Sequence, residues 1–85
     1  MTDFARTVID AFVERRQKGS AVSAADEQLV FTWEQSGAPA WVVLEGIDDA
    51  FARKAAPPES LQACGRWIKA AIARWHAAGE GSIGG

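Results

Sequence analysis

Few side chains in this chain have the chemistry and spacing that catalysis needs. His76 is the only histidine and Cys64 the only cysteine among 85 residues, too few for a zinc site of usual ligand spacing, and we expect no catalytic triad with a histidine base. Asp48 and Asp49 are adjacent in sequence and would point about 100° apart on a helix, which is poor geometry for an acid–base pair. We therefore expect no enzymatic activity, no metal and no cofactor.

The cysteine count and the charge also limit the compartment and the partners. A single cysteine cannot form an intramolecular disulfide and suits a reducing compartment, and no apolar run approaches the roughly 18–20 residues that span a bilayer. The expected localisation is cytoplasmic, without a membrane segment. Because the net charge is −2, binding to nucleic acid would depend on a local basic patch.

These side chains must be positioned by helices, two of which are predicted in the N-terminal half. The first covers residues 3–18, with Gly19 as its C-terminal cap. The second starts after Ser23, a favourable N-cap, and ends before Gly37. The first helix buries a stripe at helical spacing, made of Phe4, Ala5, Val8, Ile9, Phe12 and Val13. On the second, Leu29, Val30 and Trp33 share one face and Phe31 points away from it.

Two further helices are predicted in the C-terminal half. One has Pro39 in its first turn and stops at the Ala-Pro-Pro run of residues 56–58. The other begins near residue 58 or 59 and ends at Ala77 or Ala78, before Gly79. The apolar stripe of the third helix is Val43, Leu44, Ile47, Ala50 and Phe51. The stripe of the fourth is Leu61, Cys64, Ile68, Ala71, Ile72 and Trp75, and we expect Trp75 to lie in the core.

Together these patterns predict an all-α fold, a compact bundle of about four short helices in one domain over residues 1–79. Short connections favour near-antiparallel neighbours, and Gly65, at the edge of an apolar stripe, would let a neighbouring helix approach closely. The glycine-rich residues 80–85 are expected to form a flexible tail.

The last helix, together with the end of the preceding one, carries a candidate nucleic-acid surface. Trp67 lies at the edge of the apolar stripe, where it could stack on a base with cations nearby. The alternative is that Trp67 is a structural boundary residue and the basic residues are solvated. The candidate nucleic-acid-binding residues are Arg53, Lys54, Arg66, Trp67, Lys69 and Arg74.

The third helix carries a candidate protein-binding surface of opposite charge. Helical geometry places Trp41 among acidic residues, and Phe31 projects from the preceding helix. Exposed aromatic residues ringed by charge are typical of protein-binding surfaces, although the two rings could instead pack on one another or on the first helix. The candidate protein-binding residues are Phe31, Trp41, Glu45, Asp48 and Asp49.

Residues 27–79 also resemble the C-terminal helical domain of the DnaD-like family, whose members act in primosome assembly and replication restart. The matching features are Trp33 at the end of a helix, the run VVLEGIDDAFARK at 42–54 and the run WIKAAIARW at 67–75. The resemblance implies a helical fold that binds DNA or primosome proteins through its last helix.

Within WIKAAIARW, Ile68 and Trp75 match the family pattern, and Ala71 with Ile72 stands for an apolar pair. Trp67 replaces the usual tyrosine and Ala71 the usual isoleucine. Because the aromatic pair is part of the family signature, the implied role in binding DNA or primosome proteins extends to Trp67 and Trp75 only. The chain is also similar to uncharacterised small bacterial helical proteins, and this similarity implies the fold alone. The shared residues are Ser23, Asp26, Trp33, Gly37, Pro39 and the run 43–51.

The expected function is a non-enzymatic interaction module that contacts nucleic acid, or a complex that handles it, through the last helix. The alternative is a protein-binding adaptor or phage-type inhibitor that uses the acidic aromatic face of the third helix. A weak, salt-sensitive DNA contact and a protein partner are both expected, and a homodimer stays open because short helical domains often complete their cores across a two-fold axis.

Overall fold

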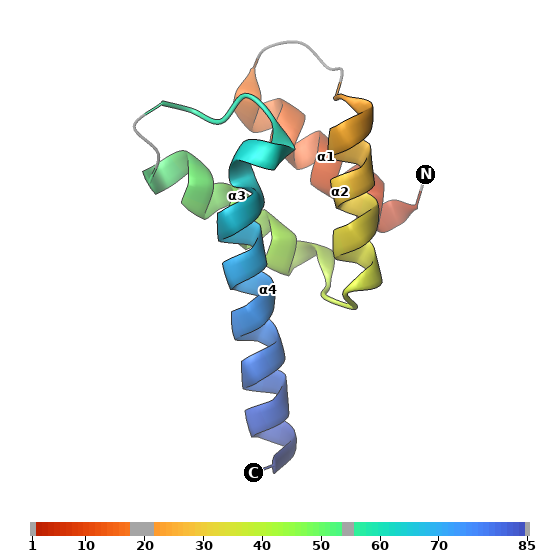
Figure 1. Cartoon of the computed structure of the whole chain (residues 1–85), viewed down its shortest axis with the longest axis vertical. Helices are drawn as coiled ribbons and strands as arrows, with labels where there is room; N and C mark the ends of the chain where they lie inside the picture. The colour runs from red at the N-terminus through yellow and green to blue at the C-terminus, as the bar shows by residue number, and fades with distance from the viewer. Residues whose placement is uncertain (1, 18–21, 54–55, 85) are drawn as a thin grey trace.

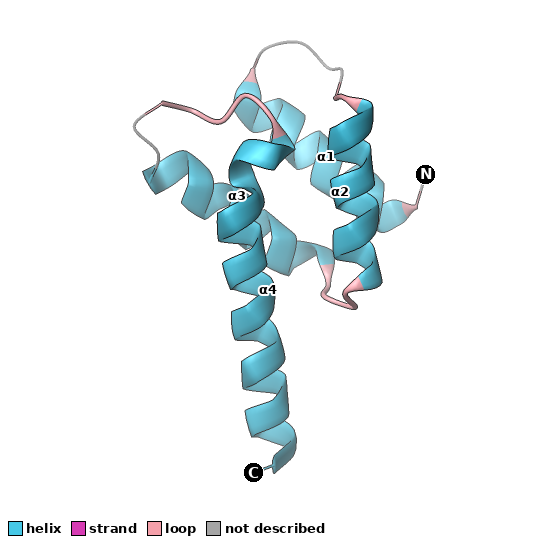
Figure 2. Ribbon diagram, in the orientation of Figure 1, coloured by secondary structure: helices cyan, strands magenta, loops and turns pink. Residues whose placement is uncertain are grey.

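Four α-helices make up the described part of the chain. The computed structural model describes residues 2–17, 22–53 and 56–84, without the side chains of 80–84. The helices are α1 (Asp3–Arg16), α2 (Ala24–Gln35), α3 (Ala40–Arg53) and α4 (Leu61–Gly84), and none of the described residues is in a strand (Figures 1 and 2). The all-α fold predicted from periodicity is confirmed.

Local caps set the ends of the first two helices. At the start of α2, the Ser23 hydroxyl accepts a hydrogen bond of 3.1 Å from the Asp26 amide, which confirms the predicted N-cap. At the end of α1, Gln17 adopts a left-handed φ of 57° and donates its amide to the Val13 carbonyl. The helix therefore ends at Arg16, two residues earlier than predicted, and the predicted cap at Gly19 lies outside the described residues.

Helix α4 differs most from its predicted bounds. It begins at Leu61 rather than at residue 58 or 59 and continues to Gly84, past the predicted end at Gly79. A terminating glycine usually takes a left-handed φ, but among the described glycines only Gly37 has a positive φ, of 85°. Gly79 is thus an ordinary helical residue. The backbone of residues 80–84 belongs to α4, while their side chains and Gly85, the rest of the predicted tail, lie outside the description.

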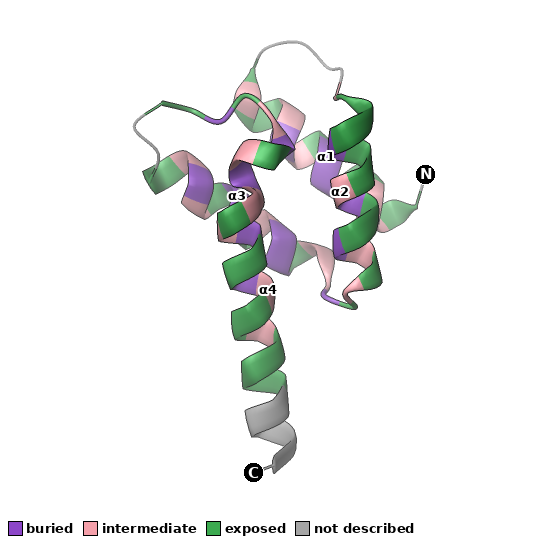
Figure 3. Cartoon of the chain, in the orientation of Figure 1, coloured by how far each residue is buried: buried purple, intermediate pink, exposed green. Residues whose placement is uncertain are grey.

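All four helices contribute to one apolar core, which is purple in Figure 3. Each predicted stripe supplies buried residues to this core, and other members of the stripes, such as Phe4, Leu44 and Ile72, are only partly covered. Burying these side chains removes apolar surface from water, which is the main favourable term in folding. The buried core residues are Val8, Ile9, Phe12, Val30, Trp33, Val43, Ile47, Ala50, Leu61, Cys64 and Ile68.

The closest helix contact is between α3 and α4, at Gly46. A Cβ atom added to Gly46 would lie 2.8 Å from both the amide nitrogen and Cγ1 of Ile68, and closer still to its Cα. Figure 1 shows α4 crossing α3 obliquely rather than running antiparallel to it. Gly46 therefore permits the crossing. The sequence-based assignment of this role to Gly65 is wrong, because a Cβ there would meet nothing within 4 Å.

Helix α4 is much longer than the helix it packs on. It has 24 residues, against 14 in α3, so at 1.5 Å per residue it is longer by about 15 Å. Its C-terminal half projects from the other helices, and the described residues there are largely exposed (Figures 1 and 3). The apolar stripe of α4 thus continues beyond the core.

A buried carboxylate ties α2 to the start of α4. Asp26 is only 2% exposed, and its two oxygens accept hydrogen bonds of 3.1 Å from the Leu61 amide and 3.3 Å from the Gln62 amide. These amides belong to the first turn of α4 and have no partner within the helix. A side chain in the first turn of one helix therefore caps another helix.

Candidate interaction surfaces

Trp41, at the start of α3, is one of two large apolar side chains that are exposed among the described residues. It is 58% exposed, as expected from its place among acidic residues rather than on the apolar stripe. It lines a shallow groove of about 200 Å³ between α3 and α4, here called the Trp41 groove. The other residues that line this groove are Val42, Glu45, Ala71, Arg74, Trp75 and Ala78.

Trp75 lines the same groove from α4, which corrects its expected place in the core. It is half-buried, packs beside a small second cluster of Ala38, Val42 and Ala71, and meets the His76 ring edge-on with 4.9 Å between centroids. The helical period placed Trp75 correctly on the apolar side of α4. Its partial exposure follows from the length of α4, which carries Trp75 past most of α3.

Ion pairs connect the acidic face of α3 to its neighbours. Arg74 Nη2 lies 3.4 Å from Glu45 Oε1 and 3.5 Å from Asp49 Oδ2, and Arg15 Nη2 lies 2.5 Å from Asp48 Oδ1. All but Asp49 have side chains about half exposed, so each pair contributes little to stability. The sequence assigned Arg74 to a nucleic-acid surface, but the structure brings it together with the acidic residues of the protein-binding surface.

Phe31, predicted to share a surface with Trp41, lies elsewhere. It is 57% exposed on α2 and lines a groove of about 370 Å³ between α1 and α2. That groove shares no lining residue with the Trp41 groove. The two exposed aromatic side chains therefore belong to separate surfaces.

The basic residues predicted to contact nucleic acid are spread over two helices. Arg53 is exposed at the end of α3, Arg66 and Lys69 are exposed on α4, and Lys54 lies outside the described residues. Trp67 is half-buried against the core, and the Arg66 guanidinium carbon lies 5.1 Å from its ring centroid. Arg66 is thus an arginine that lies against the Trp67 ring.

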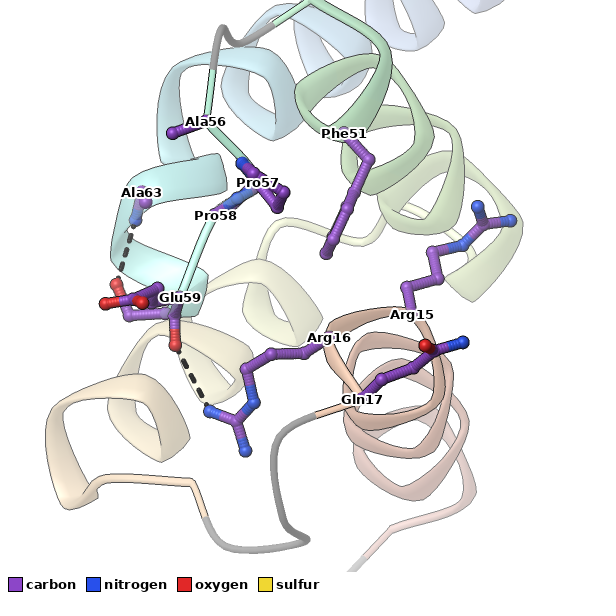
Figure 4. Close-up of a pocket in the computed structure, with 10 residues that line it drawn as sticks. Arg15, Arg16, Gln17, Phe51, Ala56, Pro57, Pro58, Glu59 and Ala63 are labelled. Carbon is purple, nitrogen blue, oxygen red and sulfur yellow. Dashed lines mark hydrogen bonds between the residues drawn. The ribbon is translucent and has the colours of Figure 1, made fainter.

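A larger cleft, of about 810 Å³, lies where the end of α1 faces the connection from α3 to α4 (Figure 4). Phe51 points into it opposite Pro57, and Arg16 reaches across to donate a 3.2 Å hydrogen bond to the Glu59 carbonyl. The Arg16 guanidinium also lies 5.1 Å from the Phe12 ring centroid. This arginine acts as a structural link between α1 and the start of α4.

Sequence reasoning missed the roles of both Arg16 and Asp26. Arg16 is an arginine in the last turn of a helix, and such side chains usually lie in solvent and interact with the helix dipole. Asp26 is an acidic residue in the first turn of a helix, and such residues usually interact only with their own helix. In each case the partner is more than 30 residues away in sequence, and nothing in the local pattern indicates it.

The described residues present no constellation for metal binding or nucleophilic chemistry. No group of three or more His, Cys, Asp or Glu side chains among them could hold a metal ion. Cys64 is buried, with its sulfur 3.7 Å from the Ser60 carbonyl oxygen, and His76 is exposed beside Trp75. What the described side chains offer is a set of grooves lined by aromatic and charged groups.

Within residues 2–17, 22–53 and 56–84, no helix combines the length and the apolar character needed to cross a lipid bilayer. The resemblance to the DnaD-like domain rests on the residues quoted for it. Comparison of the chain with protein-family models, with curated proteins and with solved structures gives no match.

Proposed function

We propose that this chain is a non-enzymatic helical module that binds a partner protein through the Trp41 groove. The observation that carries the proposal is the exposure of Trp41 beside the half-exposed Trp75. Tryptophan is among the residue types that contribute most to binding energy at protein interfaces, and leaving its ring in water is unfavourable unless a partner covers it.

The size and the rim of the groove support a protein rather than a small ligand. Its volume of about 200 Å³ is below the roughly 300–1,000 Å³ of small-molecule pockets, and suits one or two side chains of a partner. Glu45 and Arg74 supply charges of both signs at its edge. A polar rim around an aromatic centre is the usual arrangement of a protein interface.

The projecting half of α4 also supports a partner at this place. Helices in proteins gain most of their stability from packing of an apolar face. The part of α4 that carries Trp75 extends past α3, so α3 does not cover all of its apolar face. A protein seated on Trp41 and Trp75 would cover this part of α4 and stabilise it.

The Trp41→Ala variant tests the proposal. It should keep the fold, because the side chain is mostly exposed, and should weaken partner binding by about 2 kcal/mol or more, roughly 30-fold. The partner would be identified by affinity capture from the host and mass spectrometry, and its dissociation constant then measured by titration with purified protein.

The matched control is Phe31→Ala, which removes an equally exposed aromatic ring from a separate groove. Binding of a partner seated on the Trp41 groove should be unchanged in this variant, because the two grooves share no lining residue. The proposal fails if Trp41→Ala binds the partner as tightly as the unmodified chain, or if nuclease treatment abolishes the capture.

A second candidate function is nucleic-acid binding through α4, the function that the resemblance to the DnaD-like domain implies. Its support is the exposure of Arg66 and Lys69 three residues apart on α4, with the Arg66 guanidinium over the ring of Trp67. Arg74 adds little to it, because Glu45 and Asp49 offset its charge. The remaining cations would give weak binding.

Titration with single- and double-stranded DNA tests this second candidate. With two or three phosphate contacts, the slope of log K against log salt should be about −2 to −3, and Arg66→Ala with Lys69→Ala should reduce its magnitude by about 2. Arg6→Ala with Arg15→Ala removes the same charge from α1 and should have little effect. Absence of measurable affinity at about 50 mM salt would exclude this function.

A further inference from the structure

The α1–α2 groove is a second apolar surface, distinct from the Trp41 groove. Its floor is formed by Ala5 and Ile9 of α1 and Val30 of α2, and the Phe31 ring stands at its edge. With a volume of about 370 Å³, it has room for the apolar side chains of one helical segment. Grooves between two helices commonly take such amphipathic helices.

The rim of this groove carries negative charge. Glu27 and Glu34 both line it and lie four residues before and three residues after Phe31, hence on the same face of α2. Thr2 also lines it, and no Lys or Arg is among the described residues that do so. Among these lining residues, the exposed aromatic ring is therefore bracketed by two carboxylates and accompanied by no Lys or Arg side chain.

We propose that the α1–α2 groove binds a short amphipathic helix of a partner protein that carries lysine or arginine on either side of an apolar residue. The apolar residue would lie against Phe31 and Ile9, while the flanking cations pair with Glu27 and Glu34. Complementary charge of this kind speeds association and fixes the register of the bound segment.

The same carboxylates disfavour other occupants. An anionic lipid surface and a nucleic acid both attract basic surfaces and would be repelled by Glu27 and Glu34. A purely apolar molecule would leave the two carboxylates without a role in binding. The proposal does not depend on the Trp41 groove, since the two grooves share no lining residue.

A pair of synthetic probes tests the charge argument. One is a helical peptide of about four turns, with leucines along one face and lysines beside them, and the other has glutamates in place of the lysines. At about 50 mM salt, the lysine probe should bind at least about tenfold more tightly than the glutamate probe. In NMR titrations, amide shifts should concentrate at Ala5, Ile9, Glu27 and Phe31.

Two variants then assign the affinity to the groove. Phe31→Ala and the double variant Glu27→Gln with Glu34→Gln should each weaken binding of the lysine probe about tenfold. The control, Asp10→Asn with Glu14→Gln, removes the same charge from exposed positions on α1 outside the groove and should leave binding unchanged. If Phe31→Ala fails to fold, the charge variants still decide the question.

Several results would overturn the proposal. These are equal binding of the two probes, an equal loss in the Asp10/Glu14 control, or amide shifts centred on Trp41. Sedimentation showing a dimer that Phe31→Ala dissociates would assign the groove to a second copy of the chain instead. Binding to vesicles containing phosphatidylserine that Glu27→Gln with Glu34→Gln changes would assign it to a membrane surface.

Discussion

Replacing Gly46 with alanine is expected to destabilise the fold by about 3 kcal/mol or more. The added Cβ would lie 2.8 Å from the Ile68 amide nitrogen and closer to Ile68 Cα, and a backbone cannot move aside as the end of a flexible side chain can. Relieving the overlap requires α3 and α4 to separate, which would open the core at Ile47 and Ile68. The helix propensity gained from alanine, about 1 kcal/mol, offsets only part of this loss.

Urea unfolding followed by tryptophan fluorescence would give the loss in free energy, and the melting temperature should fall by at least about 10 °C. The matched control is Gly65→Ala, also inside a helix, where the new Cβ meets nothing within 4 Å. We expect this variant to be more stable by about 0.5–1 kcal/mol. A Gly46→Ala protein as stable as the unmodified chain would show that the helices do not cross at this residue.

These two glycines illustrate how far the sequence determines the fold. Periodicity gives the buried face of each helix, because the face depends only on the angle between successive residues. Val8, Val43 and Ile68 were placed in the core in this way, and they are buried. Periodicity does not say where along that face a neighbouring helix crosses, and so it could not distinguish Gly46 from Gly65.

Burial near the end of a helix depends on the length of its neighbours as well as on its own pattern. Trp75 lies on the same stripe as Leu61 and Ile68, which are fully buried. It is nevertheless half-exposed, because α4 extends past α3. Val42, which follows Trp41 in sequence and is not on the predicted stripe, is 1% exposed because it packs in the small second cluster with Ala38 and Ala71. The Trp41 groove thus depends on the relative placement of α3 and α4.

The predicted interaction residues show the same limit. Angular position placed Phe31 and Trp41 off the buried faces of their helices but left open whether the two rings pack on one another or on the first helix; both are more than half exposed. Their assignment to one surface did not follow, since it required knowing which helix lies beside each of them. Arg74 was likewise assigned by its charge and its helix, whereas its contacts with Glu45 and Asp49 arise from the packing of α4 on α3.

Asp26 is the position where a polar substitution should have the largest effect. Asp26→Ala is expected to destabilise the fold by about 3 kcal/mol, because it removes hydrogen bonds from a charged group and leaves the Leu61 and Gln62 amides without their acceptor. Loss of an N-cap alone costs about 0.5–2 kcal/mol. The larger value is expected here because Asp26 is buried, so that water cannot readily replace it.

The neighbouring carboxylate provides the control for this prediction. Glu27 is also in the first turn of α2 but is exposed, so Glu27→Ala should cost at most about 1 kcal/mol through the helix dipole. Asp26→Asn keeps one acceptor oxygen and should fall between the two variants. Urea unfolding would rank all three, and hydrogen exchange should show faster exchange of the Leu61 and Gln62 amides in both Asp26 variants. If Asp26→Ala and Glu27→Ala lose equal stability, the cap between α2 and α4 does not hold the fold, and α4 must be anchored by its apolar contacts in the core and by the Arg16 link.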